Sequence, residues 1–577
     1  MTESLQAESE GPTLPLRPAA EIMTPEGMSA FKASRLSFLR YVIRRMVRER
    51  WQISPTRFEL DEEGRGTVVY LLETPHRPIH FVVFSDNLPE ERRTDRIIEN
   101  HYDGEAFLCV GDPTEARIEA QRGEFADFLL GRSDIETLGW TRVNRSSRVF
   151  NAIADALAEG RQPDMDLVAS AGYLVRNNGF WGSGRHGTAV MEAFSREEFL
   201  GRPYHADLLT LFMWRHFSLD LVEHIARCKN PQAVVLDPKI RRFIGAGNAS
   251  GLGLVPFVIR HPKRVHNWIF CRETAIARVK AMAVSHEGPE TAQLLNLIER
   301  AIAYYATGIQ VRPGIFAGSD KLVEDLSALR DVVEAFQQDG CIDGTQPALP
   351  CWGALCGWAA ANLHAEGLEQ LHSLLIEIYP QVADELEEAV LATVDGTLDV
   401  RPEQRVGDLL SWLELGYGWA LEIDVASDGA RQHFWYLSYD NLEPRHGLRG
   451  VDPGEEFETF VDLVGEVQAL ADDLRVAPSE QSVGAFLFAH PQHRNTIERV
   501  QSVAHCDYGE VRANVLSKDF EPCHLIRFLL TQYGMEKLDP QSRLWVRGTF
   551  LQGAPTADDI AAGVEEDWIF PMPPSLD

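Results

Sequence analysis

The chain has 577 residues, of which 45% are hydrophobic and 24% are charged, a composition typical of folded globular proteins. Its formal net charge is −31 at pH 7, because 86 Asp and Glu residues outnumber 55 Lys and Arg residues. Proteins that bind nucleic acid neutralise phosphates with an excess of Lys and Arg, so this composition argues against a nucleic-acid partner.

The number of cysteines and the length of the apolar segments indicate the cellular compartment of the protein. Eight cysteines, none of them in a Cys-x-x-Cys pair, are too few for a disulfide scaffold. The first residues contain no apolar run of the signal-peptide type, and no stretch of about 18 apolar residues without charge occurs. We therefore expect a cytoplasmic protein with reduced thiols and no membrane partner. The identity of any cofactor and the formation of a homo-oligomer stay open.

The N-terminal third is predicted to contain both helix and strand. Residues 1–24 are polar and Pro-containing, and we expect them to be disordered. Apolar residues recur at three- and four-residue spacing between Met28 and Trp51, which predicts a helix. Runs of β-branched and aromatic residues then predict strands near 53–60, 66–74, 79–85 and 106–112. Helices are expected over 113–160.

The rest of the chain is predicted to be mainly helical. Long apolar helices are expected over 206–228 and 266–284, within a middle region that also has Gly-rich loops. A block rich in Ala, Leu and Trp over 352–395 predicts buried helices. An extended hairpin is expected over 417–440, followed by helices near 455–474 and 483–504.

Two distant segments are nearly alike. HFVVFSDN begins at His80, and HFWYLSYDN begins at His433. An extended run that starts at a glycine precedes each of them: GTVVYLLE from Gly66 and GWALEIDV from Gly418. This similarity predicts that one antiparallel hairpin occurs twice by internal duplication. A chance match between short segments is the alternative.

These patterns together predict a mixed α/β (α+β) fold with more helix than strand. Two small antiparallel hairpin sheets would lie in duplicated N- and C-terminal lobes, around a helical middle. The expected division is a tail at 1–24, an N-terminal α/β lobe at 25–160, a central mainly helical domain at 161–338, a helical block at 350–400 and a C-terminal α/β lobe at 401–577.

A glycine-rich segment over 239–257 is the first candidate site. Successive backbone amides in a glycine loop can cradle a phosphate or carboxylate, and basic residues flank this segment. No Walker lysine follows, so we predict an anion site without a nucleotide-binding fold. The predicted ligand-binding residues are Arg242, Gly245, Gly247, Asn248, Ser250, Gly251 and Gly253. The alternative is a turn that joins two helices.

A second candidate loop reads RNNGFWGSGRHG over 176–187. Asn178 and Trp181 are predicted to contact a ligand, with Arg185 on its carboxylate. His186 is the candidate general acid or base of this loop. The alternative is a tight loop in which Trp181 is a buried anchor.

A third candidate lies on the helix predicted over 208–228. His216, Asp220, Glu223 and His224 follow one another at positions i, i+4, i+7 and i+8, so their side chains share one stripe of the helix. Such a stripe suits proton transfer, and we take all four as candidate catalytic residues. No second motif of matching ligands is present, so no metal site is predicted here. The alternative is a solvated helix face.

The three segments lie close in sequence, which predicts an enzyme that acts on a small anionic metabolite. The carboxylate or phosphate would bind to the Gly-rich loops, and the helix stripe would supply acid and base groups. Lyase, isomerase, hydrolase and transferase chemistries all remain open. A non-catalytic binding or assembly protein is the first alternative, and a metal- or haem-dependent redox enzyme is the second. An enzyme predicts that loops and stripe converge on one pocket.

Overall fold

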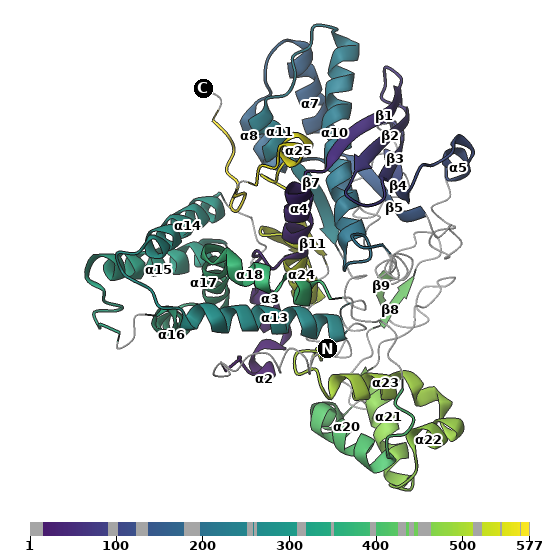
Figure 1. Cartoon of the computed structure of the whole chain (residues 1–577), viewed down its shortest axis with the longest axis vertical. Helices are drawn as coiled ribbons and strands as arrows, with labels where there is room; N and C mark the ends of the chain where they lie inside the picture. The colour runs from purple at the N-terminus through teal and green to yellow at the C-terminus, as the bar shows by residue number, and fades with distance from the viewer. Residues whose placement is uncertain are drawn as a thin grey trace.

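The computed structural model describes residues 15–89, 102–122, 137–177, 197–250, 258, 262–307, 319–347, 351–392, 400–424, 434–437, 444–447, 463–511, 522–542, 545–565 and 567–575. Helices outnumber strands, which confirms the predicted mixed α/β class. A large sheet with its covering helices, a block of packed helices and a smaller helical module follow one another along the molecule (Figure 1).

One sheet of nine strands dominates the strand content. Its order is β1-β2-β3-β4-β5-β6-β7-β11-β10, and the only parallel neighbours among these described strands are β6 and β7. The strands are β1 (Gln52–Leu60), β2 (Gly66–Glu73), β3 (Ile79–Ser85), β4 (Gly104–Val110), β5 (Thr137–Arg145), β6 (Tyr173–Asn177), β7 (Gly245–Ser250), β10 (Leu538–Ser542) and β11 (Trp545–Phe550).

The central strands alternate between two apolar faces. Val68 and Tyr70 of β2 and Phe81 of β3 belong to the main core of the molecule. Val69 and Val82 point the other way, into a small cluster that also contains Ile118 of α5 (Glu115–Ala120). Successive side chains of a strand point to opposite faces, so both faces of β2 and β3 are covered.

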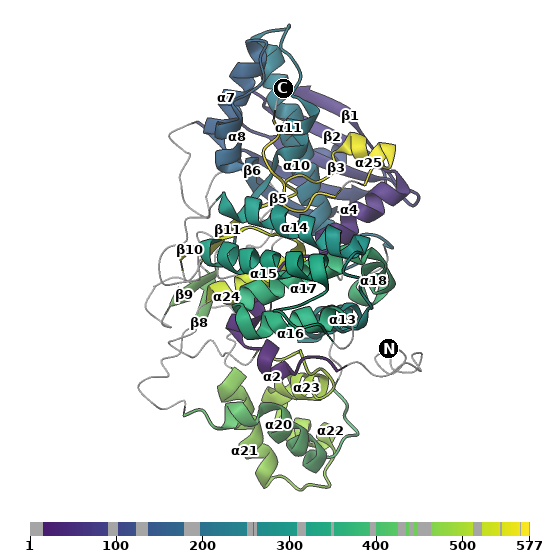
Figure 2. The ribbon, with the colours of Figure 1, turned by 90° about the vertical axis from the view of Figure 1, so that its left-hand side faces the viewer.

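Helices pack on the main-core face of the sheet. They are α4 (Phe38–Glu49), α7 (Ser147–Ala158), α8 (Met165–Ala171), α10 (His205–Lys229) and α11 (Pro238–Phe243). Figure 2 shows α7, α8, α10 and α11 together beside the strands. The 25-residue helix α10 lies in the connection between the parallel strands β6 and β7, and most of its residues are buried. A crossover helix of this kind is what a parallel pair requires.

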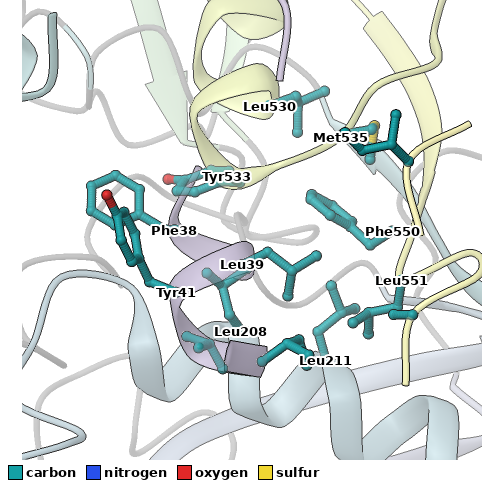
Figure 3. Packing of buried hydrophobic residues seen from close by; sticks show 14 of the residues in the cluster. Phe38, Leu39, Tyr41, Leu208, Leu211, Leu530, Tyr533, Met535, Phe550 and Leu551 are labelled. Atoms are coloured by element: carbon teal, nitrogen blue, oxygen red, sulfur yellow. The ribbon is translucent and has the colours of Figure 1, made fainter. Parts of the chain in front are cut away.

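The two chain ends meet in the main core. Leu39 of α4 points toward Leu211 of α10 and Phe550 of β11, and Phe38 of α4 lies beside Tyr533 of α24 (Pro522–Tyr533) (Figure 3). The helix α25 (Ala557–Ala562) follows β11 and contacts α4. The core therefore joins elements that are separated by most of the chain.

The block of packed helices extends the same core. It contains α3 (Pro25–Ala30), α13 (Pro262–Ala281), α14 (Pro289–Ala306), α15 (Ser319–Asp339), α16 (Trp352–Asn362), α17 (Ala365–Ile378), α18 (Pro380–Glu385) and α19 (Glu387–Val390). Part of the tail expected to be disordered also belongs here: α2 (Ala19–Ile22) is ordered. Ile22 is buried, and Arg17 pairs with Glu273 and Glu369, which holds this segment on the fold.

A separate helical module has its own apolar core. It contains α20 (Val406–Leu421), α21 (Leu463–Val476), α22 (Val483–Ala489), the short 3₁₀ turn η2 (Pro491–His493) and α23 (Arg494–Val503). We call these elements the helical module. Among the described residues, none of the helices has both the length and the apolar character needed to cross a lipid bilayer.

The structure differs from the predicted pair of hairpin sheets. The hairpin β2–β3 is part of the nine-stranded sheet, and Gly418–Leu421 end helix α20 where a strand was expected. The strand β8 (Phe434–Leu437) instead pairs with β9 (Pro444–Gly447). Val406, Leu409, Leu413, Tyr417 and Ala420 are buried at helical spacing, and this pattern outweighs the strand tendency of the short run from Gly418. Among the described residues, no second hairpin therefore repeats β2–β3.

Candidate functional site

A cavity of about 190 Å³ lies beside the middle of α10. Its walls come from the start of β1, from α10 and α11, and from the start of α25. Its polar lining residues are Arg215, His216, Asp220, Arg241, Thr556 and Asp558. Two of the four candidate catalytic residues on the α10 stripe, His216 and Asp220, therefore border a cavity. We call it the α10 cavity.

Asp220 is held by two hydrogen bonds from other elements. The Tyr70 hydroxyl donates to its Oδ2 at 2.8 Å, and Nη2 of Arg241 donates to its Oδ1 at 3.2 Å. Burial first, and then the nearby Asp220 carboxylate, raise the pKa of the Tyr70 phenol well above its ordinary value. Tyr70 therefore stays protonated and acts as a fixed donor that orients the carboxylate.

His216 is one helical turn before Asp220. Its Nε2 lies 3.5 Å from Oδ2 of Asp220, and its ring packs edge-on against Tyr70 at 5.2 Å between centroids. Burial lowers the pKa of the imidazole, although Asp220 acts in the opposite direction. His216 is therefore neutral at pH 7 and has a nitrogen that can accept a proton.

Arg215 forms the wall between α10, α11 and the segment before α25. Its side chain is 2% exposed, and burial lowers the pKa of its guanidinium to about 9. It donates to the backbone carbonyls of Arg241, Arg242, Ile244, Ala554 and Pro555. These bonds occupy the guanidinium, so Arg215 shapes the cavity and is not its anion-binding group.

The other two stripe residues bind neighbouring elements. Glu223 Oε1 accepts hydrogen bonds from Nη1 of Arg241 at 2.6 Å and from the backbone N–H of Leu236 at 3.1 Å, which fixes α11 against α10. Nε2 of His224 lies 2.9 Å from the carbonyl oxygen of Asp61, at the surface. Neither residue lines the α10 cavity, so their predicted catalytic roles have no support from this geometry.

The glycine-rich segment begins as a strand, which corrects the expected loop. Gly245–Ser250 form β7, between β6 and β11. A Cβ on Gly245 would lie 2.3 Å from the carbonyl oxygen of Phe550, and one on Gly247 would lie 2.8 Å from the Tyr173 ring. Close strand packing therefore explains these two glycines. Arg242 donates to the Gly553 carbonyl at 3.0 Å.

The remaining ligand-binding predictions stay untested. Asn248 is buried on β7, where it neighbours Asn177 of β6. Ser250 is the last residue of β7, and its side chain lies outside the described residues. So do the other residues predicted in the two glycine-rich loops, namely Asn178, Trp181, Arg185, His186, Gly251 and Gly253.

The topology nonetheless brings the origins of the two glycine-rich segments together. Asn177, the last residue of β6, neighbours Asn248 near the end of β7, and these strands are parallel. Both segments therefore follow the carboxyl ends of two neighbouring parallel strands, a place where ligands often bind in parallel sheets. Close to the carboxyl ends of these strands, the Asp103 carboxylate accepts a hydrogen bond from the backbone N–H of Arg145. Nη2 of Arg145 donates a hydrogen bond to Asn87.

The α10 cavity lies at the opposite end of β7 from Asn248 and Ser250. Arg215 donates to the carbonyls of Arg241 and Ile244, directly before β7, whereas Ser250 is the last residue of this strand. Six residues of strand span about 17 Å at roughly 3.3 Å per residue. Of the three predicted segments, the described residues bring only Arg241 of the segment over 239–257 to the cavity of His216 and Asp220, and most of both glycine-rich loops lies outside the described residues.

Sequence reasoning missed three residues that build the cavity: Tyr70, Arg215 and Arg241. Arg241 stood out only as a basic flank of the glycine-rich segment, and Tyr70 as a strand residue. The sequence held one indication for Arg215, because it is a cation within an otherwise apolar helix. A buried cation needs hydrogen-bond partners.

This chain matches no protein-family model, no curated protein and no solved structure. The function proposed for it therefore depends on the geometry of its own residues.

Proposed function

We propose that the chain is an enzyme that performs acid/base catalysis on a small anionic metabolite in the α10 cavity. One observation carries the proposal: a neutral imidazole and an oriented carboxylate, His216 and Asp220, border the same cavity. The 190 Å³ volume is below the roughly 300–1,000 Å³ of sites for drug-sized ligands, so a small metabolite fits best.

The arrangement supports His216 as the group that transfers the proton. Asp220 lies near Nε2 and favours the tautomer with its proton on that nitrogen, which leaves Nδ1 as the acceptor. Tyr70 and Arg241 hold Asp220 in place, so the carboxylate is a positioning group for the imidazole. This division of roles follows the general logic of a base that a third group orients.

Arg241 is the proposed contact for the carboxylate or phosphate of the substrate. It is partly exposed in the cavity wall, and Asp220 and Glu223 fix its position. These two bonds use one N–H on each Nη atom, which leaves three of the five guanidinium N–H groups for a substrate. Guanidinium groups bind carboxylates and phosphates through paired hydrogen bonds. Arg241 belongs to the segment over 239–257, but Gly245 and Gly247 of that segment are strand residues of β7 and do not line this cavity.

The experiment is a thermal-shift screen with small carboxylated and phosphorylated metabolites, followed by turnover assays on each hit. A ligand that binds the native state raises the melting temperature. We expect His216→Gln to keep the ligand shift and to lower kcat by about 10²–10⁴-fold, the usual contribution of a general acid or base.

His224→Gln is the matched control, because His224 lies on the same helix but outside the cavity. It should leave kcat unchanged. Turnover that survives His216→Gln, or a hit whose binding is insensitive to Arg241→Gln, would remove the α10 cavity as the active site.

One observation favours the binding or assembly alternative. Three large apolar side chains of the helical module are strongly exposed: Leu415 at 89%, Val476 at 83% and Phe488 at 92%. Exposed apolar side chains mark interaction surfaces where they lie together, and Leu415 and Val476 adjoin the two residues of the Glu414–Arg475 ion pair. Acid/base chemistry in the α10 cavity gives no reason for these three residues.

A further inference from the structure

Two histidines and one aspartate meet in the helical module. This module lies well away from helix α10 (Figure 1). Nε2 of His493 lies 2.8 Å from Oδ2 of Asp473, and Nδ1 of His490 lies 3.1 Å from the same oxygen. The three candidate ligand atoms all lie within 4.8 Å of one another. We call these residues the His-His-Asp cluster.

The local sequence explains why both imidazoles face one carboxylate. The segment reads His-Pro-Gln-His, and Pro491 begins the 3₁₀ turn η2 directly after His490. Side chains at i and i+3 eclipse in a 3₁₀ turn, so His490 and His493 lie on the same side. Both rings stack on Phe486 with interplanar angles of 16°. Asp473 reaches them from the last turn of α21.

We propose that the His-His-Asp cluster binds a divalent first-row metal ion, with Zn²⁺ as the best match. Tetrahedral zinc has bonds of about 2.0–2.2 Å to nitrogen and oxygen, which places ligand atoms about 3.3 Å apart. The separations of the two imidazole nitrogens from Oδ2, 3.1 Å and 2.8 Å, are already within about 0.5 Å of that value. Imidazole and carboxylate together form a donor set that zinc accepts.

The exposure of the three side chains fits a site that solvent can reach. The His493 side chain is only 6% exposed and is fixed in the module, whereas those of His490 and Asp473 are 32% and 36% exposed. Three protein ligands leave a fourth position, which a water molecule would occupy. An ion at this position would replace the two N–H hydrogen bonds to Asp473 with two metal–nitrogen bonds.

A metal here has a structural use. The cluster joins the α22–η2 corner to α21, within a core of only sixteen buried apolar residues. Small domains often depend on a structural metal ion or on disulfide bonds for stability. Zn²⁺ bound to the native module should therefore raise its melting temperature.

The test uses the full chain, stripped of metal with a chelator and titrated with Zn²⁺ against a chromophoric competitor. Asp473→Asn keeps the shape of the side chain and an oxygen acceptor, but removes the negative charge. We expect the wild type to bind one tight equivalent more than this variant, with affinity at the site reduced about 100-fold or more. His490→Gln should show the same loss, and Co²⁺ should give visible absorption bands only in the wild type.

His364→Gln is the matched control. Nδ1 of His364 lies 3.0 Å from Asp325, a His–carboxylate pair that belongs to no three-ligand group among the described residues. This variant should keep the full number of tight equivalents. The proposal is overturned if Asp473→Asn or His490→Gln, folded by circular dichroism, binds as many tight equivalents as the wild type. This outcome is independent of any turnover in the α10 cavity.

Discussion

At the scale of single residues, Gly245 shows how closely the strands of the sheet approach. Its missing side chain leaves room for the Phe550 carbonyl, which would lie 2.3 Å from a Cβ. A backbone oxygen in a paired strand has little freedom to move, so Gly245→Ala forces the ladder between β7 and β11 apart. We expect the free energy of unfolding to fall by about 2–3 kcal/mol, as for other overpacked sites, when measured with urea.

Gly357→Ala is the control for this substitution. Gly357 is exposed on α16, and a Cβ there would have no atom within 4 Å. Alanine is the better helix former, so this variant should gain about 1 kcal/mol. Equal urea midpoints for Gly245→Ala and the wild type would contradict the close approach of β7 and β11.

Asp207 gives the chain a dependence of stability on pH. It is buried at the start of α10, and burial raises the pKa of its carboxyl to about 7, although Arg264 opposes the shift. The folded-state pKa is above the unfolded-state value near 3.9. The contribution of the protonated carboxyl to the free energy of unfolding is therefore fully present below about pH 4. It is lost as the pH rises through about 7.

Asp207→Asn should therefore be more stable than the wild type at pH 8, by a few kcal/mol, and the difference should shrink toward pH 4. Urea unfolding at a series of pH values measures this. Glu62→Gln is the control, since Glu62 is an exposed turn residue. If the free energies of unfolding of Asp207→Asn and the wild type change in parallel with pH, the pKa of Asp207 is not raised in the folded protein and the prediction is wrong.

At the scale of elements, the sequence predicted those parts of the fold that local patterns encode. Strands expected near 53–60, 66–74 and 79–85 correspond to β1, β2 and β3 within about one residue. The residues Val68 to Leu72 and Phe81 to Phe84 alternate between two apolar faces, and that alternation is visible in the sequence.

The same reasoning failed where two patterns competed. The run from Gly418 has the composition of a strand, but Leu413, Tyr417 and Ala420 continue the buried face of α20. A helical face that starts earlier in the chain decides the conformation, because its packing outweighs local strand propensity.

The candidate site was predictable only in part, because spacing within one helix does not identify the partners of its side chains on other elements. The spacing of His216 and Asp220 places both on one side of a helix, which is a local property. Their partners Tyr70 and Arg241 come from β2 and α11, and the cavity also needs the start of α25. No spacing within α10 indicates which distant elements will lie opposite it.

At the scale of the whole molecule, the long-range pairings define the architecture. The strand β11 near the C-terminus pairs with β7 in the middle of the chain. The helix α4 near the N-terminus contacts α24 and α25 near the C-terminus, and its Leu39 shares the main core with Phe550 of β11 (Figure 3). Short sequence patterns carry no information about such partners. The helical module, in contrast, closes an apolar core from elements within Val406–Val503.

The two cores predict two separable unfolding events. Leu470 is 0% exposed in the core of the helical module, and Phe81 is 0% exposed in the main core. Removal of a buried Leu or Phe side chain to Ala costs about 2–5 kcal/mol. Because these residues belong to different clusters, Leu470→Ala should lower one calorimetric transition and leave the other in place.

Phe81→Ala provides the reciprocal measurement. It should lower the transition that Leu470→Ala leaves unchanged, since Phe81 packs in the main core and β3 contributes no residue to the core of the helical module. Chelation of a metal bound to the His-His-Asp cluster should act on the same transition as Leu470→Ala, because Asp473 and Leu470 share α21. A single transition that all three changes shift equally would mean that the helical module and the main core unfold as one cooperative unit.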